Sequence, residues 1–416
     1  MKKTLTVFIL TVVALLGAGI VVMASASTKL ALESPRYHGD LYYFLKRQAI
    51  WLGVALVCGC LVCLFDYHHW KKFQLLKKYP LLPILFYVFV VALLVLTLCP
   101  GLKQKINGSY RWLVLGPFSI QPGEFAKLAI IVTTAIWMDY IKRRPTLAVA
   151  VAAVTTRGMR VKKRLMEFVQ EIAVPGMLLG IFAFLMYKEK DLGALMVVCV
   201  LGLSLMFVAG IRKVYLFSFG GVAAVLASCW VWLDAPRLKR ITAWWNFLFD
   251  PDGVKVTADN YQLIQSTIAF KMGGLGGVGF NQSTQKQFYL PEAHTDFVAA
   301  IGGEELGFFF SVGIVIAYAV LLICGILISL HAPDRLGRLL AFGMVFLLVF
   351  QGAFNIGVVT GVFPTKGIAL PFISYGGSNL ITALVAVGTL FNIGTQVDSD
   401  NERMYTRVVR NAARAG

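Results

Sequence analysis

The chain has 416 residues, of which 58% are hydrophobic and 14% are charged, and its formal net charge is +18. Soluble domains carry roughly a quarter charged residues, so this composition excludes an ordinary soluble protein and indicates an integral membrane protein. The apolar residues form continuous runs rather than the alternating pattern of a membrane β-barrel. The basic residues lie mainly at the ends of these runs, without an aromatic–basic nucleic-acid motif, so we expect no nucleic-acid partner.

The apolar runs predict an all-α membrane protein with about ten transmembrane helices. The first run resembles a signal peptide, but its length of about 20 residues favours an uncleaved span. The predicted spans cover residues 4–25, 47–65, 80–99, 122–140, 172–187, 192–210, 214–233, 308–330, 339–360 and 377–395.

The distribution of basic residues predicts which side of the membrane each end occupies. An even number of spans places both termini on one side. With both termini in the cytoplasm, more than half of the 39 Lys and Arg residues fall in cytoplasmic segments, as the positive-inside rule requires. We therefore predict one transmembrane domain at 1–395, a basic cytoplasmic tail at 396–416, and a large outer loop at 234–307 between spans 7 and 8.

Two segments between the fourth and fifth predicted spans have other patterns. Residues 145–156 are apolar but too few to cross a bilayer, so we expect an interfacial or re-entrant piece. Residues 160–171 are rich in Lys and Arg and predict a helix on the surface of anionic lipid.

Acidic residues and a histidine gather at the end of the predicted outer loop, in FYLPEAHTDFVAAIGGEELGF (288–308). A carboxylate at the edge of a membrane cavity, such as Asp296, is costly to desolvate. Desolvation raises its pKa and makes it a better general base, which His294 is close enough to tune. The alternative is a solvated loop acid that pairs with Lys286 or Arg240. The residues by themselves leave both interpretations open.

Glu304 and Glu305 come directly before the eighth predicted span. We interpret them as interfacial acids near a helix N-terminus, where the helix dipole stabilises negative charge.

The segment NGSYRWLVLGPFSIQPGEFAKLA (107–129) leads into the fourth predicted span. Glu124 and Lys127 are three residues apart and therefore lie on one face of that helix. They form either an internal ion pair or part of a polar cavity. Trp112 is typical of the aromatic belt at a membrane interface.

The segment GVFPTKGIALPFISYGGSNL (361–380) joins the last two predicted spans and contains several helix breakers. Irregular backbone at membrane depth needs surrounding protein or a wet cavity, so we favour the wall of a site over a plain hairpin turn. Lys366, Ser374 and Ser378 could hold an anionic group there.

These three segments resemble the blocks of the SEDS family of bacterial cell-wall polymerases, the FtsW/RodA/SpoVE group, and the resemblance runs from about residue 10 to 395. PTKG is similar to the FtsW form of the third block. KEKDLGA departs from the family's usual Q-P-D-x-G, keeping Asp191 and Gly193. The resemblance implies a peptidoglycan glycosyltransferase that polymerises lipid II during cell division, with Asp296 of HTDF as the essential aspartate.

The resemblance also implies a substrate site and partners. Cationic groups would stabilise the departing pyrophosphate, possible ones being Lys366, Arg240, Lys286 and Lys127. A divalent cation, Mg or Mn, bridged by Asp296 could share that role. The other expected substrate-binding residues are Trp112, Glu124, His294, Glu305, Ser374 and Ser378.

The expected partners are a class B penicillin-binding protein, other divisome proteins and membrane lipids. The expected location is the bacterial cytoplasmic membrane, with the active site facing outward. A lipid II flippase, a scaffold for a transpeptidase and a RodA-like elongation polymerase are the alternative functions.

Overall fold

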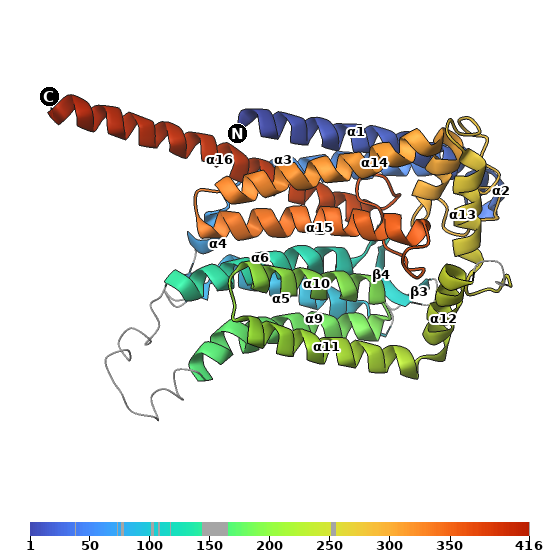
Figure 1. Ribbon diagram of the computed structural model, residues 1–416, viewed down its shortest axis with the longest axis horizontal. Coiled ribbons are helices and arrows are strands. Elements are labelled where there is room, and N and C mark those ends of the chain that lie inside the picture. Colours follow the sequence, from blue (N-terminus) through green and yellow to red (C-terminus); the bar gives the residue numbers. More distant parts are fainter. Residues whose placement is uncertain are drawn as a thin grey trace.

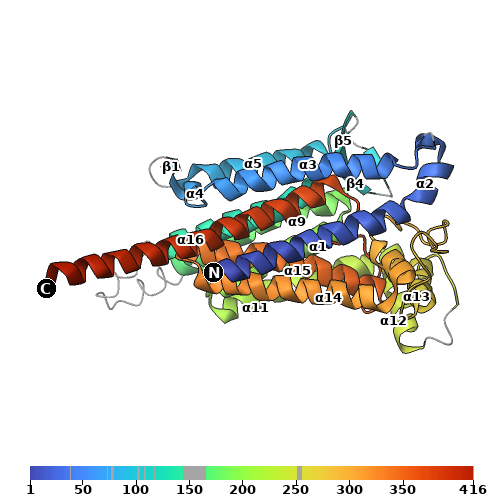
Figure 2. The ribbon, with the colours of Figure 1, turned by 90° about the horizontal axis from the view of Figure 1, so that it is seen from above.

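The computed structural model describes residues 1–37, 39–72, 74–75, 79–100, 104–106, 109–116, 118–143, 165–250 and 255–415. The chain forms a bundle of long helices that run in roughly one direction, with both termini at the same end (Figure 1). Loops and short helices gather at the opposite end (Figure 2).

The described elements are mostly helices. The α-helices are α1 (Lys2–Ala26), α2 (Thr28–Glu33), α3 (Tyr43–Leu64), α4 (His69–Lys72), α5 (Leu81–Leu96), α6 (Pro122–Arg143), α9 (Val174–Glu189), α10 (Leu192–Val208), α11 (Lys213–Leu233), α12 (Ala235–Phe249), α13 (Tyr261–Gly273), α14 (Val298–His331), α15 (Arg335–Val359) and α16 (Gly377–Ala415). A 3-10 turn (Pro35–Tyr37) and a π-helical turn (Val169–Ala173) complete the helical part. The strands are β1 (Gln74–Leu75), β2 (Tyr79–Pro80), β3 (Gln104–Ile106), β4 (Ser109–Leu115) and β5 (Phe118–Ile120).

A helix covers each predicted span, which confirms a mainly helical membrane protein. Among the described residues, seven helices are long and apolar enough to cross a membrane. The helices α5 and α10 are apolar but shorter, and α6 carries charged side chains that make it less apolar. The number of spans therefore stays a prediction.

The helix of the fifth predicted span, which includes α9, begins earlier than predicted. A continuous helix runs from Leu165 to Glu189 and includes the π-helical turn. The Trp137 indole contacts this turn by donating a hydrogen bond to the Gln170 carbonyl at 2.8 Å. The described part of the segment predicted as a surface helix at 160–171 is helical, and it continues into the helix of the fifth predicted span. Its position on a lipid surface stays a prediction. Residues 145–156 lie outside the described residues.

The eighth predicted span is the second part of α14. Gly307 has φ 76° and breaks the helix, so a short segment from Val298 precedes the span that begins near Phe308. A Cβ at Gly307 would lie within 2.6 Å of the Leu275 carbonyl oxygen. Glycine is needed because of both this backbone angle and this close approach.

A three-stranded antiparallel sheet, β3-β4-β5, departs from the all-α expectation. Leu113 pairs with Ile120, and Leu115 pairs with Phe118. The segment SYRWLVL is rich in aromatic and branched side chains, which favour a strand. The sheet matters for the site because β4 carries Arg111 and Trp112.

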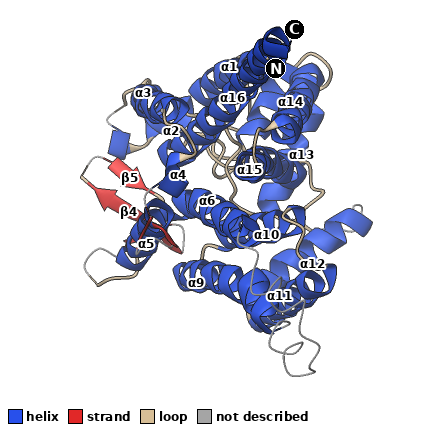
Figure 3. Cartoon of the chain, turned by 90° about the vertical axis from the view of Figure 1, so that its left-hand side faces the viewer, coloured by secondary structure: helices blue, strands red, loops and turns tan. Residues whose placement is uncertain are grey.

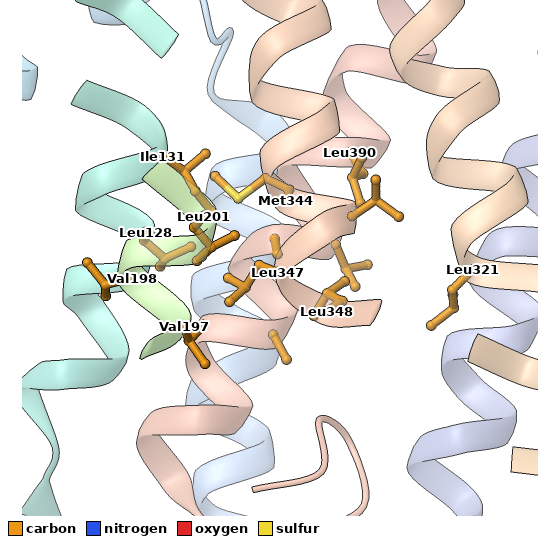
Figure 4. Packing of buried hydrophobic residues seen from close by; sticks show 14 of the residues in the cluster. Leu128, Ile131, Val197, Val198, Leu201, Leu321, Met344, Leu347, Leu348 and Leu390 are labelled. Carbon is orange, nitrogen blue, oxygen red and sulfur yellow. The ribbon is translucent and has the colours of Figure 1, made fainter. Parts of the chain in front are cut away.

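The helix α15 lies in the middle of the bundle when it is seen end-on (Figure 3). Of its most apolar stretch, 61% is buried, against 7% for the peripheral α11. Close packing between membrane helices depends on van der Waals contact and small residues. Figure 4 shows this packing among α6, α10, α14, α15 and α16, through Leu128, Ile131, Val197, Val198, Leu201, Leu321, Met344, Leu347, Leu348 and Leu390.

Candidate active site

A polar cavity of about 300 Å³ opens at the end of the bundle opposite to the termini. Aromatic and cationic side chains enter its wall from α3 and β4. The helix α6, the start of α10 and the loops before α14 and α16 contribute the acids, Lys127 and Tyr375. The lining includes Tyr43, Phe44, Arg47, Trp51, Arg111, Trp112, Gln121, Glu124, Lys127, Asp191, Gly193, Glu292, His294, Thr295, Asp296, Gly367, Tyr375, Ser378 and Asn379.

Asp296 enters the cavity from a loop that is held in place by a side-chain hydrogen bond to its backbone carbonyl. The Asn355 amide donates to the Asp296 carbonyl and to the Ile368 carbonyl, each at 2.7 Å. One buried side chain of α15 thus joins the loop before α14 to the loop before α16. The Asp296 carboxylate rests on Gly367, where an added Cβ would lie 2.5 Å from Oδ2.

A second pair of bonds links the same two loops. The Ser374 hydroxyl donates to the Thr295 carbonyl at 2.6 Å and accepts from the Leu370 amide at 2.8 Å. The Tyr375 amide donates to the His294 carbonyl at 3.1 Å. Ser374 therefore orders the wall, and it does not belong to the cavity lining where we predicted it to hold an anion.

Burial shifts the two titratable groups of HTDF in opposite directions. Burial raises the pKa of Asp296 to about 7; Arg111 opposes this shift, and nearby carboxylates add to it. Burial lowers the pKa of His294, whose ring centroid lies 5.1 Å from that of Phe44. A neutral imidazole thus lies beside an acid that titrates near neutral pH. This combination suits general base catalysis.

Ion pairs occupy the wall facing Asp296. Glu124 and Lys127 are both buried, and Lys127 Nζ donates to Glu124 Oε1 at 2.6 Å. This confirms that they share one helix face, and they line the cavity as well, so both interpretations of the pair apply. Ser378 also lines the cavity, where its hydroxyl accepts from the Gln121 amide at 2.9 Å. Trp112 lines it from β4.

Asp191 is a cavity residue that sequence reasoning did not select. It caps α10 by accepting from the Ala194 amide at 3.1 Å, it accepts from the Gln121 side chain at 2.9 Å, and Arg111 lies 3.8 Å away. The left-handed Lys190, with φ 63°, turns the chain so that this cap faces the cavity. Two features of the sequence could have pointed to Asp191. It stands as an N-cap directly before an apolar run, and it is kept in the family block.

Lys286 and Glu305 lie in a separate buried cluster rather than in the cavity lining. Lys286 Nζ is 3.0 Å from Glu305 Oε1, which also accepts from the Ser25 hydroxyl at 2.6 Å. Glu304 accepts from the Thr284 amide at 2.8 Å and from the Ser283 hydroxyl. The interpretation of Glu304 and Glu305 as interfacial acids is wrong, because both are buried ahead of the Gly307 break.

Lys366 and Arg240 also lie outside the cavity lining. Arg240 Nε is 4.0 Å from Asp259 Oδ1. Lys366 comes directly before Gly367, on which Asp296 rests. The alternative prediction was that Asp296 pairs with Lys286 or Arg240. The structure contains neither pair, because Lys286 pairs with Glu305 and Arg240 with Asp259.

Two of the cavity carboxylates already have partners within the chain. One Glu124 oxygen bonds to Lys127, and Asp191 is engaged by Ala194 and Gln121. Across the described residues, no group of three or more His, Cys, Asp or Glu side chains converges with the geometry of metal ligands. Mg and Mn are commonly held by one or two carboxylates together with substrate phosphates and water, so a cation shared between Asp296 and the substrate stays a prediction.

The fold and the cavity define a class: a helical multi-pass membrane protein with a carboxylate-lined polar cavity at one end of its bundle. The family model described as "Cell cycle protein", FTSW_RODA_SPOVE, matches residues 5–399. The chain belongs to the FtsW/RodA/SpoVE family, which confirms the resemblance in the three blocks.

Curated relatives match over nearly the whole chain. The probable peptidoglycan glycosyltransferase FtsW of Trichlorobacter lovleyi is 39% identical over 387 residues, covering 93% of this chain and 92% of the relative. Stage V sporulation protein E of Bacillus subtilis is 38% identical over 396 residues, covering 94% and 98%.

Solved structures share the fold. A chain of a peptidoglycan synthase complex that coordinates polymerization and crosslinking aligns with a TM-score of 0.67 at 28% identity, covering 94% of this chain and 97% of that one. A variant of the rod shape determining protein RodA of Thermus thermophilus aligns with a TM-score of 0.61 at 25% identity, covering 93% and 96%.

Proposed function

We propose that this protein is a peptidoglycan glycosyltransferase that polymerises lipid II into glycan strands for septal wall synthesis. The observation that carries the proposal is the Asp296 carboxyl, which burial gives a pKa of about 7 inside a cavity that also presents cations. The relatives named as probable peptidoglycan glycosyltransferases support the same activity at 36–39% identity.

Asp296 acts as the general base in the proposed mechanism. Its carboxylate takes the proton from the 4-hydroxyl of the acceptor sugar. The hydroxyl oxygen forms a bond to the anomeric carbon of the donor, and the bond from that carbon to the phosphate oxygen breaks. The lipid diphosphate leaves with the electron pair. A base with a pKa near the working pH serves such a transfer best.

Cationic side chains stabilise the charge that develops on the leaving diphosphate. Arg47, Arg111 and Lys127 face the cavity and are placed to do so. Glu124 and Asp191 hold two of these cations in position, through the bond of 2.6 Å to Lys127 and the separation of 3.8 Å from Arg111. Trp112 and His294 would contact the sugar rings from the cavity wall.

The proposed topology has ten spans, cytoplasmic termini and a cavity that faces the outside of the bacterial cytoplasmic membrane. The termini lie at one end of the bundle, and β4 and the loops that carry the cavity residues lie toward the other end, which supports this arrangement (Figure 2). Residues 1–395 form the transmembrane domain and residues 396–416 the basic tail. The helix α16 continues to Ala415, so the tail extends the last span without a break.

The proposed partner is a class B penicillin-binding protein that crosslinks the strands. The support is the structural likeness to a chain of a peptidoglycan synthase complex. A peripheral helix such as α11, with 7% of its apolar stretch buried, leaves membrane-facing surface for a partner helix. Other divisome proteins and the surrounding membrane lipids complete the proposed assembly.

Polymerisation of purified lipid II in vesicles, with and without the cognate class B partner, tests the proposed function. We expect glycan strands with the partner present, detected by gel electrophoresis of labelled product. Movement of labelled lipid II across the vesicle membrane without any strands would replace the polymerase by a flippase. Neither activity, together with retained binding of the partner, would favour a scaffold.

A further inference from the structure

One fully buried acid takes no part in the proposed mechanism. Glu189 is the last residue of α9 and follows the fifth predicted span. Its Oε1 contacts the Thr97 hydroxyl, and its Oε2 has no hydrogen-bond partner among the described residues. Nor does any Lys, Arg or His in that part of the chain form an ion pair with it. A buried carboxylate without a cation is far costlier than the neutral acid, so these surroundings favour a protonated Glu189.

The contacts of Thr97 require one more proton than its own hydroxyl has. Thr97 ends α5 and is fully buried. Its Oγ lies 2.7 Å from the Leu94 carbonyl oxygen and 2.5 Å from Glu189 Oε1. A hydroxyl has one proton and a carbonyl oxygen only accepts, so two separate hydrogen bonds need a second donor. A protonated Glu189 supplies it by donating to Thr97, which in turn donates to Leu94.

The charged groups packed around Glu189 have other partners. Arg111 lies on β4, which packs against α9, and its guanidinium is 3.8 Å from Asp191. Glu124 and Lys127 of α6 pair with each other. The helix α5 carries no charged side chain, and the lysines directly before and after Glu189 are exposed. The described surroundings therefore give Glu189 no counter-charge of its own.

A short turn connects Glu189 to the cavity. Lys190, with φ 63°, reverses the chain, and the Asp191 amide donates to the Met186 carbonyl at 3.0 Å. Asp191 lines the cavity together with Arg111, whose buried Nε has no hydrogen-bond partner in the described part of the chain. Anchoring Glu189 to α5 thus fixes the turn that directs Asp191 toward Arg111.

We propose that Glu189 is a neutral carboxylic acid that donates a hydrogen bond to Thr97 and is a positioning residue for Asp191. Through Asp191 it keeps Arg111 available to the leaving diphosphate, so this inference rests on the proposed polymerase function. A second negative charge beside Asp191 would compete with the substrate for Arg111. The family block usually has Gln where this chain has Glu189, and an amide is also an uncharged donor.

Infrared spectroscopy tests the protonation state without turnover. Asp296→Asn protein in nanodiscs at neutral pH is compared with the same protein carrying Glu189→Gln, so a single carboxyl differs. We expect the difference spectrum to contain the C=O stretch of a protonated carboxyl, which shifts in D2O. Thr97→Val should move this band, because it removes the partner hydroxyl, and Thr97→Ser should not. Glu167→Gln, the same change at an acid paired with Arg212, is the matched control and should remove no such band.

A double-mutant cycle on lipid II polymerisation tests the positioning role. We expect Glu189→Gln to stay within about twofold of the wild-type kcat and Glu189→Ala to lose about tenfold, because misplaced groups react more slowly. In an Arg111→Gln background, Glu189→Ala should cause no further loss, since the residue through which it acts is gone. Thermal unfolding of each variant shows that folded proteins are compared.

Three results would overturn the proposal. The first is a difference spectrum without a protonated-carboxyl band, which would make Glu189 a carboxylate. The second is an equal loss of rate in Glu189→Gln and Glu189→Ala. The third is a full tenfold loss from Glu189→Ala in the Arg111→Gln background, as a purely structural role would give. The infrared band needs no turnover and strand formation by the wild type is measured separately, so failure of this inference and failure of the polymerase can be told apart.

Discussion

Asp296 and the pair Glu304 and Glu305 lie within ten residues of one another, yet their surroundings differ in kind. The two glutamates accept hydrogen bonds from backbone amides, from Ser25 and from Lys286. In the described part of the chain, the Asp296 carboxylate accepts none and faces the cavity. Buried acids normally have their acceptors filled, so the unfilled one is the candidate for chemistry.

The two regions also differ in whether their acidic side chains hold parts of the molecule together. The Glu305 cluster joins the end of α1, through Ser25, to the loop before Lys286 and to α14. Asp296 holds nothing through its side chain, because its loop is fixed by its carbonyl and by Asn355. Substitutions in the first region should therefore change stability, and substitutions in the second should change activity.

Asp296→Asn gives the largest expected effect on rate. The amide keeps the shape but cannot accept the proton, so polymerisation of lipid II should fall by about 10²–10⁴-fold. Thermal unfolding should be unchanged or shifted upward, because a desolvated charge is removed. Asp40→Asn, the same change at a half-exposed loop acid outside the cavity lining, should keep the wild-type rate. Full activity in Asp296→Asn would remove the proposed base.

Glu305→Ala should change stability instead. It leaves the Lys286 ammonium buried without its acid, a change that typically costs about 3–5 kcal/mol. We expect a lower midpoint in thermal or denaturant unfolding. The double variant Glu305→Leu with Lys286→Met should recover much of this loss, because no buried charge remains. Equal stability of Glu305→Ala and the wild type would show that the cluster does not hold the fold.

The pH dependence should separate the two regions further. The pKa of Asp296 is raised to about 7, so the rate should rise with pH and level off above about 7. The pKa of Asp296 is about 7 in the folded protein and has its ordinary value of 3.8 in the unfolded chain, so the folded state binds this proton more tightly. The resulting contribution to the free energy of unfolding is complete below pH 3.8 and is lost as the pH rises through 7. Unfolding measured from pH 5 to 8 should show this slope in the wild type and lose it in Asp296→Asn. A pH-independent rate over this range would contradict the assignment.

Gly367→Ala should give the smallest effect. Its Cβ would lie 2.5 Å from Asp296 Oδ2, so the carboxylate must move away. Because that atom ends a short side chain, we expect little loss of stability and a fall of about tenfold in rate, since misplaced groups react more slowly. Gly180→Ala, where a Cβ would meet nothing within 4 Å, is the control. A normal rate for Gly367→Ala would mean that Asp296 tolerates displacement.

Composition and local pattern already predicted most of the helices. The spans, the Glu124–Lys127 pair on one face and the turn before α16 follow from periodicity and from helix breakers, which act within a few residues. Asp296 was also selected correctly for the cavity, through its place between long apolar runs and through the family resemblance. The sheet that carries Arg111 was missed, because the prediction was made on hydropathy alone.

What the sequence by itself determined is the class of protein and the approximate helices, because these depend on apolar length and on short motifs. Only the tertiary structure decided which charges meet. It placed Lys286 and Glu305 in a separate cluster, brought Asp191 to the cavity from 105 residues before Asp296, and left Lys366 outside the cavity lining. The physical reason is that burial and ion pairing depend on contacts between distant segments, and local sequence does not specify them.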